Sequence, residues 1–202
     1  MFDYPALPVK FPAKNIFLRL GGHLSKNEIT AAERSCYEKT ALEAFDFCRF
    51  AGRWEIFPVE RVEEKGIVLS CGKFIPSADF ASRCAGITHL WCGAATAGKE
   101  IVSRRDGSEK ISVKSIYDAV GAESADEAMD TLQRLAGSEL RRKGLLLAER
   151  RFSPGYGDMP LTVQEFFFSS LHLAELDMSL SETLYITPEK SVTAFAGVWQ
   201  GE

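Results

Sequence analysis

The sequence predicts an α+β fold in which an at least partly antiparallel sheet is flanked by helices. Segments with apolar residues at helical spacing occur along the chain, and so do short segments rich in β-branched and aromatic residues. These two kinds of segment do not alternate in a regular βαβ rhythm. No internal repeat, low-complexity tract or clear linker divides the sequence, so we treat residues 1–202 as a single domain.

A helix is predicted in the N-terminal quarter of the chain. Ser25 and Glu28 have the spacing of a capping box, in which a hydroxyl and a carboxylate satisfy the first free N–H groups of a helix. Apolar residues near helical spacing then continue to about Arg49. Gly52 follows as a plausible terminator.

The middle of the chain is predicted to contain, in order, a strand at 53–61, a strand at 67–70, a short helix from Ser77 to about Cys84 and a strand at 87–92. Pro58 suggests an edge position for the first strand, because proline donates no ladder hydrogen bond. The small residues at 93–98 follow the last strand. They suit either a close approach of the backbone to a ligand or tight packing of a helix on a strand.

The C-terminal half is predicted to be helical from Lys99 with a break near Asp106, strongly helical at 123–142, extended at 145–149, helical at 162–174, and extended at 180–186 and 191–198. The helix at 162–174 is predicted from Thr162 and Glu165, which repeat the capping-box spacing.

Composition excludes several classes of protein. Hydrophobic residues make up 46% and charged residues 26% of the 202 residues, which is typical of a soluble globular chain. The formal net charge of −4 and the lack of a long basic run argue against generic nucleic-acid binding. No run approaches the roughly 18 apolar residues of a membrane helix, and the proline-containing N-terminus has no signal-peptide core. We expect a cytoplasmic protein.

The cysteines and histidines predict no metal centre. The five cysteines are widely spaced without a C-x-x-C pair, which argues against a disulfide framework or zinc cluster and favours reduced, mostly packed thiols. His89 lies in an apolar run, where a hydrogen-bonded core histidine is favoured over a ligand.

The most unusual stretch is the segment from Arg150 to Pro160. Two prolines and two glycines in seven residues exclude both a helix and a regular strand there, so the segment is a shaped loop between a predicted strand and a predicted helix. Its Arg, Ser, Tyr and Asp side chains can all make directional polar contacts. A simple chain reversal would explain the prolines and glycines equally well.

This loop resembles a signature of a known family. Arg151-Phe-Ser-Pro-Gly-Tyr156 is similar to the Arg-x-x-x-Gly-Tyr motif of the reactivation (activation) domain of cobalamin-dependent methionine synthase. The segment from Leu180 to Ala194, with Pro-x-x-Ser-Val at 188–192, resembles that family's second block. The similarity runs in order from about residue 56 to 198 and matches short, free-standing members, whereas residues 1–55 match weakly.

The resemblance implies a site for S-adenosylmethionine. Arg151 matches the arginine that holds the ligand's carboxylate, a task suited to the guanidinium fork. Ser153 and Gly155 would offer backbone contacts to the nucleoside end. Tyr156 matches the tyrosine placed near the sulfonium and the corrin face, and it is our candidate catalytic residue, since an aromatic ring tolerates a cation and fits an apolar macrocycle.

Other positions are matched less closely. Glu127 is the best match to a glutamate near the ligand's positive end, with Glu123 as the competing alignment and an ordinary exposed acid as the other explanation. Asp158 resembles an aspartate common in free-standing members, or it stabilises a turn. The early aspartate of the fused enzymes has no counterpart, and the chain stops soon after the second block, so we expect part of the fused enzymes' ligand site to be missing.

The resemblance also implies a role and partners. In the family, cob(II)alamin is rescued by one-electron reduction coupled to methylation from S-adenosylmethionine, with a flavodoxin or ferredoxin as the electron donor. We therefore expect a component of methionine synthase reactivation rather than a complete enzyme, acting on cobalamin carried by the corrinoid-binding partner. The alternatives are a reactivator of a different corrinoid methyltransferase, a stand-alone S-adenosylmethionine-dependent methyltransferase and a non-catalytic interaction partner. The absence of a Gly-x-Gly-x-x-Gly loop disfavours the stand-alone methyltransferase.

Overall fold

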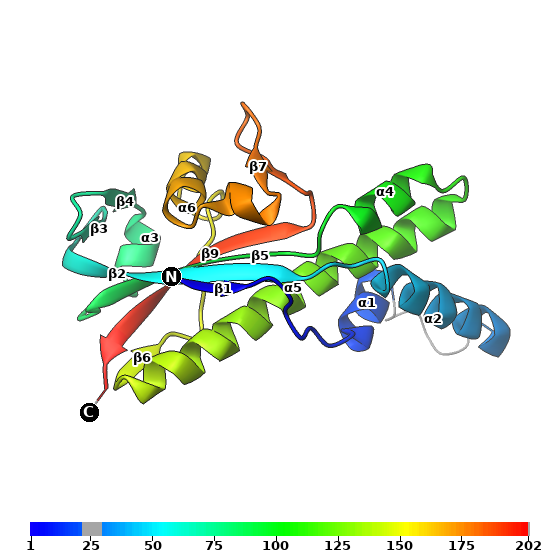
Figure 1. Cartoon of the computed structure of the whole chain (residues 1–202), viewed down its shortest axis with the longest axis horizontal. Coiled ribbons are helices and arrows are strands. Elements are labelled where there is room, and N and C mark those ends of the chain that lie inside the picture. The colour runs from blue at the N-terminus through cyan, green and yellow to red at the C-terminus, as the bar shows by residue number, and fades with distance from the viewer. Residues whose placement is uncertain (22–29, 202) are drawn as a thin grey trace.

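The strands build one long antiparallel sheet that helices cover on both faces, which confirms the predicted α+β class (Figure 1). The computed structural model describes residues 1–21 and 30–201. In the described residues the sheet order is β4 (Phe74–Pro76), β3 (Gly66–Leu69), β2 (Ala51–Glu63), β5 (His89–Thr96), β9 (Ser191–Gln200) and β6 (Leu145–Leu147), with β1 (Phe2–Tyr4) also pairing with β2.

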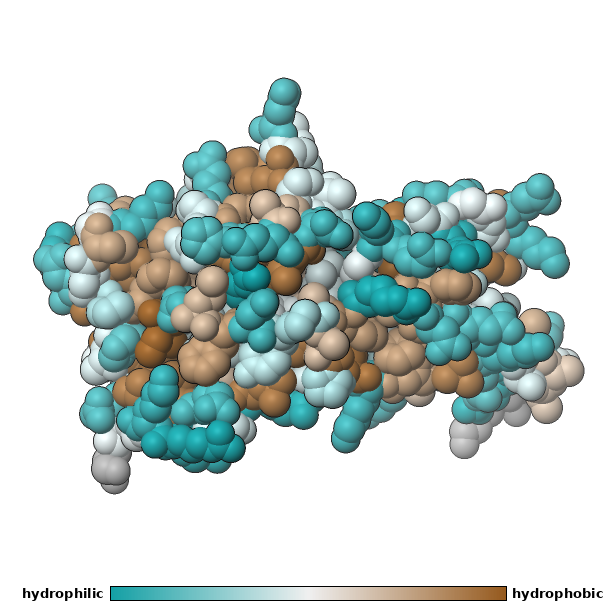
Figure 2. Space-filling view, viewed as in Figure 1, coloured by the Kyte–Doolittle hydropathy of each residue, from teal (hydrophilic) through white to brown (hydrophobic). Residues whose placement is uncertain are grey.

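The helices of the described residues are α1 (Ala13–Arg19), α2 (Ala31–Phe45), α3 (Ala78–Ala81), α4 (Glu100–Gly107), α5 (Ile111–Arg142) and α6 (Gln164–Ser170), with 3₁₀ turns η1 (Leu161–Val163) and η2 (Leu173–Leu176). A separate hairpin is formed by β7 (Ser179–Leu180) and β8 (Ile186–Thr187). This hairpin projects from the face that carries α6, and its tip is hydrophilic (Figure 2).

The two faces of the sheet bury different cores because side chains alternate along each strand. On the α5 face, Trp54 and Trp91 pack with Met129 and Leu132 of the helix. On the opposite face, α3 and α6 pack with a phenylalanine cluster made of Phe80, Phe166, Phe167 and Phe195. A third cluster joins α1, α2 and α4 to the N-terminal half of α5. The sheet is therefore anchored from both sides along its central strands.

The small residues after Cys92 belong to the sheet, so the expected end of the strand near that residue is wrong. Gly93 and the residues after it continue β5 to Thr96. A Cβ atom at Gly93 would lie 2.2 Å from the Trp91 ring, so the glycine leaves space for that buried indole under α5. Of the two explanations that the sequence leaves open, these contacts fit close packing.

The helix near the N-terminus begins later than predicted. Ser25 and Glu28 lie outside the described residues. The capping box of α2 is instead formed by Thr30 and Glu33, whose side chains each accept a hydrogen bond from the other residue's backbone N–H. Gly52 does not end this helix, because α2 stops at Phe45 and Gly52 pairs with Ala95 inside the sheet.

Two smaller expectations need correction. The strand β2 has partners on both sides, but Pro58 falls between the part paired with β1 and the part paired with β3, so its missing N–H interrupts no ladder. The helix α6 begins at Gln164 without a side-chain cap, so Thr162 and Glu165 form no capping box there.

The cysteines are all free. Cys48, Cys84 and Cys92 are buried, and Cys36 and Cys71 are exposed. Burial raises the pKa of the Cys48 and Cys84 thiols to about 12. In the described ranges no three His, Cys, Asp or Glu side chains are placed to share a metal ion. None of the helices described has both the length and the apolar character needed to cross a bilayer.

Candidate functional site

The segment that follows β6 is fixed to the sheet before it turns. Ala148 donates a backbone hydrogen bond to Gly197 at 2.9 Å, and Phe152 and Phe195 exchange two backbone hydrogen bonds of 2.9 and 2.8 Å. Because neighbouring side chains of an extended chain point to opposite faces, Phe152 packs on the Phe80 ring while Arg151 is directed toward α5. The position of Arg151 is thus set by strand geometry.

The loop beyond Phe152 is a tight turn anchored at both ends. Gly155 and Gly157 have φ values of 88° and 58°, a backbone conformation that residues other than glycine rarely adopt. Gly155 donates to the carbonyl of Met159 at 2.9 Å, and Met159 is buried in the core. Tyr156 stands between the two glycines, and 75% of the residue is exposed. The turn therefore presents Tyr156 outward on a fixed base.

Asp158 ties the loop to α3. Its carboxylate accepts hydrogen bonds from the Ser77 hydroxyl at 2.5 Å and from the Ala78 and Asp79 backbone N–H groups at 2.6 and 3.2 Å. These contacts, with that of Ser77 foremost, hold the pKa of Asp158 below its ordinary value. Asp158 therefore stabilises the loop by joining it to the first residues of α3, which differs from the turn within the loop that the alternative explanation assumes.

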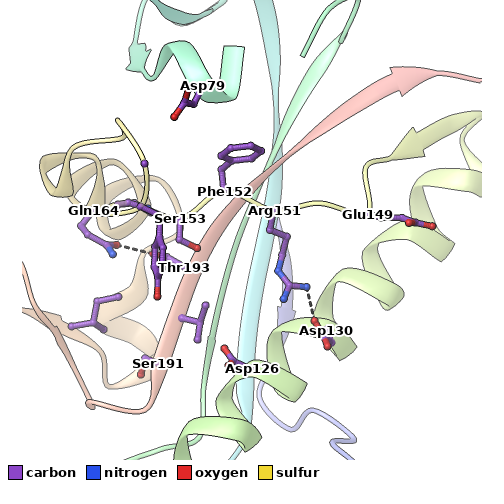
Figure 3. Close-up of a pocket in the computed structure, with 15 residues that line it drawn as sticks. Asp79, Asp126, Asp130, Glu149, Arg151, Phe152, Ser153, Gln164, Ser191 and Thr193 are labelled. Carbon is purple, nitrogen blue, oxygen red and sulfur yellow. Dashed lines mark hydrogen bonds and ion pairs between the residues drawn. The ribbon is translucent and has the colours of Figure 1, made fainter. Parts of the chain in front are cut away.

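A cleft of about 660 Å³ opens between this loop, α5, α6 and the first residues of β9, as Figure 3 shows. Such a volume is typical of small-molecule sites. The lining residues are Asp79, Asp126, Asp130, Glu149, Arg151, Phe152, Ser153, Pro154, Tyr156, Gly157, Gln164, Ile186, Ser191, Val192 and Thr193.

Arg151 is held at the wall of the cleft by α5. Its Nη1 donates to Asp130 Oδ1 at 2.6 Å and to Gln133 Oε1 at 2.5 Å. Gln133 is itself fixed, because its Nε2 donates to the carbonyls of Ala148 and Glu149 at 2.6 and 3.1 Å. Nη2 and Nε of Arg151 have no hydrogen-bond partner within the described residues. The guanidinium is therefore oriented and still has donors to offer.

The lining of the cleft is strongly acidic. Four carboxylates face one guanidinium, that of Arg151. Desolvation raises the pKa of Asp126, and the neighbouring Glu123 carboxylate adds to this, whereas Arg151 opposes it. A positively charged ligand group would relieve this repulsion. The cleft thus suits a ligand with one carboxylate for Arg151 and cationic groups for the acids.

The structure brings Arg151, Ser153 and Tyr156 together in the cleft and places the other candidates elsewhere. Gly155 belongs to the same turn but is absent from the lining, and its N–H is used within the loop. Glu127 lies on α5, 3.4 Å from Arg134 and outside the lining of this cleft, in an adjacent groove that Arg151 also lines. Glu123, its competitor, pairs with Arg19.

Several polar residues that line the cleft were not predicted from the sequence, and two pairs among them stand out. Asp126 and Asp130 are four residues apart on α5 and so share one helix face. Gln164 and Thr193 face the cleft from α6 and β9 and are joined by a hydrogen bond of 2.8 Å (Figure 3). The i, i+4 spacing of the two acids was visible in the sequence, but the second pair is formed only by the tertiary fold.

An ionic network fixes the turn that leads into β9. Arg105 of α4 holds Glu189 with two hydrogen bonds of 2.8 and 2.7 Å, and Lys190, nearly buried, donates to Asp118 of α5 at 2.7 Å. The bond from Arg105 is the main reason that the pKa of Glu189 falls to about 2. The network positions the first residues of β9, which form one wall of the cleft.

The fold is shared with a solved structure, whereas neither a protein-family model nor a curated protein matches the sequence. The crystal structure of the MetH reactivation domain bound to AdoHcy superimposes with a TM-score of 0.65 at 16% sequence identity. The match covers 96% of this chain and 79% of that one. At this identity the similarity establishes a relationship of fold.

Proposed function

We propose that this chain binds S-adenosylmethionine in the cleft beside Arg151 and presents its methyl group to a corrinoid held by a partner protein. The observation that carries the proposal is the position of the Arg151–Tyr156 turn, which lines an acidic cleft in a fold shared with an AdoHcy-bound reactivation domain. Residues 1–202 act in this proposal as one unit.

The residues of the cleft fit the charges of this ligand. The free donors of Arg151 bind its carboxylate, and the constrained guanidinium makes this a directional contact. Asp126 lies on the same wall and offers a counter-charge to the ammonium and sulfonium groups. We therefore give Asp126 the role that the family resemblance implies for Glu127, which lines the neighbouring groove together with Arg151.

The exposed Tyr156 supports a role at a partner's surface. Its ring stands at the tip of a turn beside the cleft, and Tyr185 on the projecting hairpin is also mostly exposed. Large exposed aromatic rings beside a ligand cleft favour contact with a large apolar group or a docking protein. We assign Tyr156 to the corrin-facing side of the bound ligand.

The chemistry at cobalt belongs to the partner's corrinoid: one electron from a flavodoxin or ferredoxin and the sulfonium methyl group restore the methylated cofactor and leave S-adenosylhomocysteine. This chain's residues bind the methyl donor, neutralise its charges and limit its orientations, which is how positioning accelerates a transfer between two bound groups. We assign no proton transfer and no covalent step to them.

The direct test is reactivation of cobalamin-dependent methionine synthase trapped as cob(II)alamin, with its own reactivation domain removed. We expect activity to return when this chain, reductant and S-adenosylmethionine are all present, and omission of any one should abolish the recovery. Rescue of another corrinoid methyltransferase instead would assign a different client. Failure to bind S-adenosylmethionine at millimolar concentration would contradict the proposal.

A pair of neighbouring variants tests the acid on α5. Asp126→Asn should weaken binding of S-adenosylmethionine more than that of S-adenosylhomocysteine, because only the former carries the sulfonium charge. Glu127→Gln is the matched control one position along the same helix, and it should leave both affinities within about twofold. Calorimetric titration of both ligands measures this, and the reverse pattern would return the role to Glu127.

A further inference from the structure

Gln164 is a buried amide with one half of its hydrogen-bonding capacity unused. It opens α6, and only 5% of the residue is exposed. Its Oε1 accepts a hydrogen bond from Thr193 Oγ1 at 2.8 Å, whereas its Nε2 has no partner within the described residues. This nitrogen contacts the solvent of the cleft and is not fully enclosed, so a ligand atom in the cleft can take the place of water and accept a hydrogen bond from it.

Gln164 also lies where two hollows meet. Together with Ile186 and Ser191 it lines the cleft of Arg151 and a second hollow of about 680 Å³ between α4 and the β7–β8 hairpin. Arg151 lines the first of these hollows but not the second. A ligand whose carboxylate is held by Arg151 can therefore extend its other end toward Gln164, where Ile186 and Val192 add apolar lining.

We propose that the carboxamide of Gln164 recognises the adenine ring of the bound nucleoside, an inference that rests on the proposed function. A glutamine amide offers a donor and an acceptor side by side. Adenine presents the complementary pair, an exocyclic amino donor beside a ring-nitrogen acceptor, and this bidentate pairing is a common means of recognising adenine.

The arrangement selects against a 6-oxo purine. In hypoxanthine a carbonyl replaces the amino group, so on the N7 edge two acceptors would face the amide and Oε1 would meet another oxygen. On the N1 edge the amide would have to turn over, away from the hydrogen bond in which Thr193 donates to Oε1. A good bidentate pair discriminates against the wrong base by roughly 5- to 150-fold.

The test compares S-adenosylhomocysteine with S-inosylhomocysteine by calorimetry. The wild-type chain should prefer the adenosyl compound by at least about fivefold, and Gln164→Met, which keeps the volume but removes the polar pair, should bring the ratio near one. Thr193→Val leaves Gln164 in place but frees its amide to turn, so the ratio should fall partway. Gln133→Met, the matched control at another buried glutamine, should lower both affinities through Arg151 and leave the ratio unchanged.

The outcomes separate this inference from the proposed function. If both compounds bind the wild type equally, or if Gln164→Met keeps the wild-type ratio, Gln164 serves only to join α6 to β9 and the inference is wrong while the ligand assignment stands. If neither compound binds, both are wrong. Thermal unfolding of each variant checks that it is folded. If Gln164→Met does not fold, Thr193→Val decides the question: a ratio equal to that of the wild type contradicts the inference, and a lower ratio supports it.

Discussion

Replacement of Arg151 by alanine should reduce ligand affinity far more than it reduces stability. The guanidinium contacts Asp130, whose side chain is 51% exposed, and Gln133, which lines the neighbouring groove. An ion pair with so exposed a partner contributes at most about 1 kcal/mol, and the hydrogen bond to Gln133 adds about 1 kcal/mol because water in the groove that Gln133 lines can replace it. We therefore expect a loss of about 1–2 kcal/mol in the free energy of unfolding.

The effect on binding should be larger because the ligand carboxylate would lose a charge-assisted fork. Such a contact contributes about 2 kcal/mol or more, which corresponds to roughly 30-fold in the dissociation constant. Arg151→Lys keeps the charge without the planar fork and should fall between the wild type and Arg151→Ala. Calorimetry with S-adenosylmethionine measures the affinities, and thermal unfolding measures the stabilities.

Arg142→Ala is the matched control for this experiment. Arg142 also lies on α5 and pairs with an acid, Glu139, at 2.7 Å, but its side chain is 73% exposed and lies outside the cleft. This variant should bind the ligand like the wild type. Equal affinity of Arg151→Ala and wild type, or equal losses in the two variants, would refute the role given to Arg151.

Three further predictions concern the scaffold. Gly93→Ala should destabilise the protein by about 1–3 kcal/mol, measured by chemical denaturation, because its Cβ would clash with the buried Trp91 ring. Glu189→Gln should lower the melting temperature most above pH 4.5, because the pKa of Glu189 is about 2 in the folded state and 4.5 ordinarily. The stabilisation by the ionised carboxylate is complete above pH 4.5 and is lost as the pH falls toward 2. A difference in melting temperature between variant and wild type that persists at pH 2 would contradict this prediction. Iodoacetamide should label Cys36 and Cys71 in the native protein and spare the three buried thiols, which mass spectrometry can check.

The fold was predictable where local patterns and tertiary packing agree. The strands at 53–61, 67–70 and 191–198 were found because these segments are rich in β-branched, aliphatic and aromatic residues, which suit a sheet that is buried on both faces. The extension of β5 through Gly93 was missed, since glycine and alanine have low strand propensity. Their place in the sheet depends on the Trp91 ring and on α5, which is far away in sequence.

The candidate site was predictable only where one short segment carries it. The turn from Arg151 to Tyr156 could be located because its prolines and glycines exclude regular structure. The opposite wall, with Gln164 and Thr193, is assembled from two elements that are 29 residues apart, and no local pattern relates them. Asp158 shows the same limit, because its partner Ser77 is 81 residues away.

Asp126 and Glu127 are adjacent on α5, so the choice between them depends on an alignment shift of one residue. One residue rotates a helix by about 100°, and accordingly Asp126 lines the cleft whereas Glu127 lines the neighbouring groove. Asp126 and Asp130 share the face that carries the contact to Arg151, and Glu127 turns toward Arg134. An alignment without an anchor inside the helix can shift by one position at little cost in similarity. Arg151 lines both the cleft and the neighbouring groove, so the choice depends on which of the two hollows holds the ligand, and the affinities of Asp126→Asn and Glu127→Gln decide it.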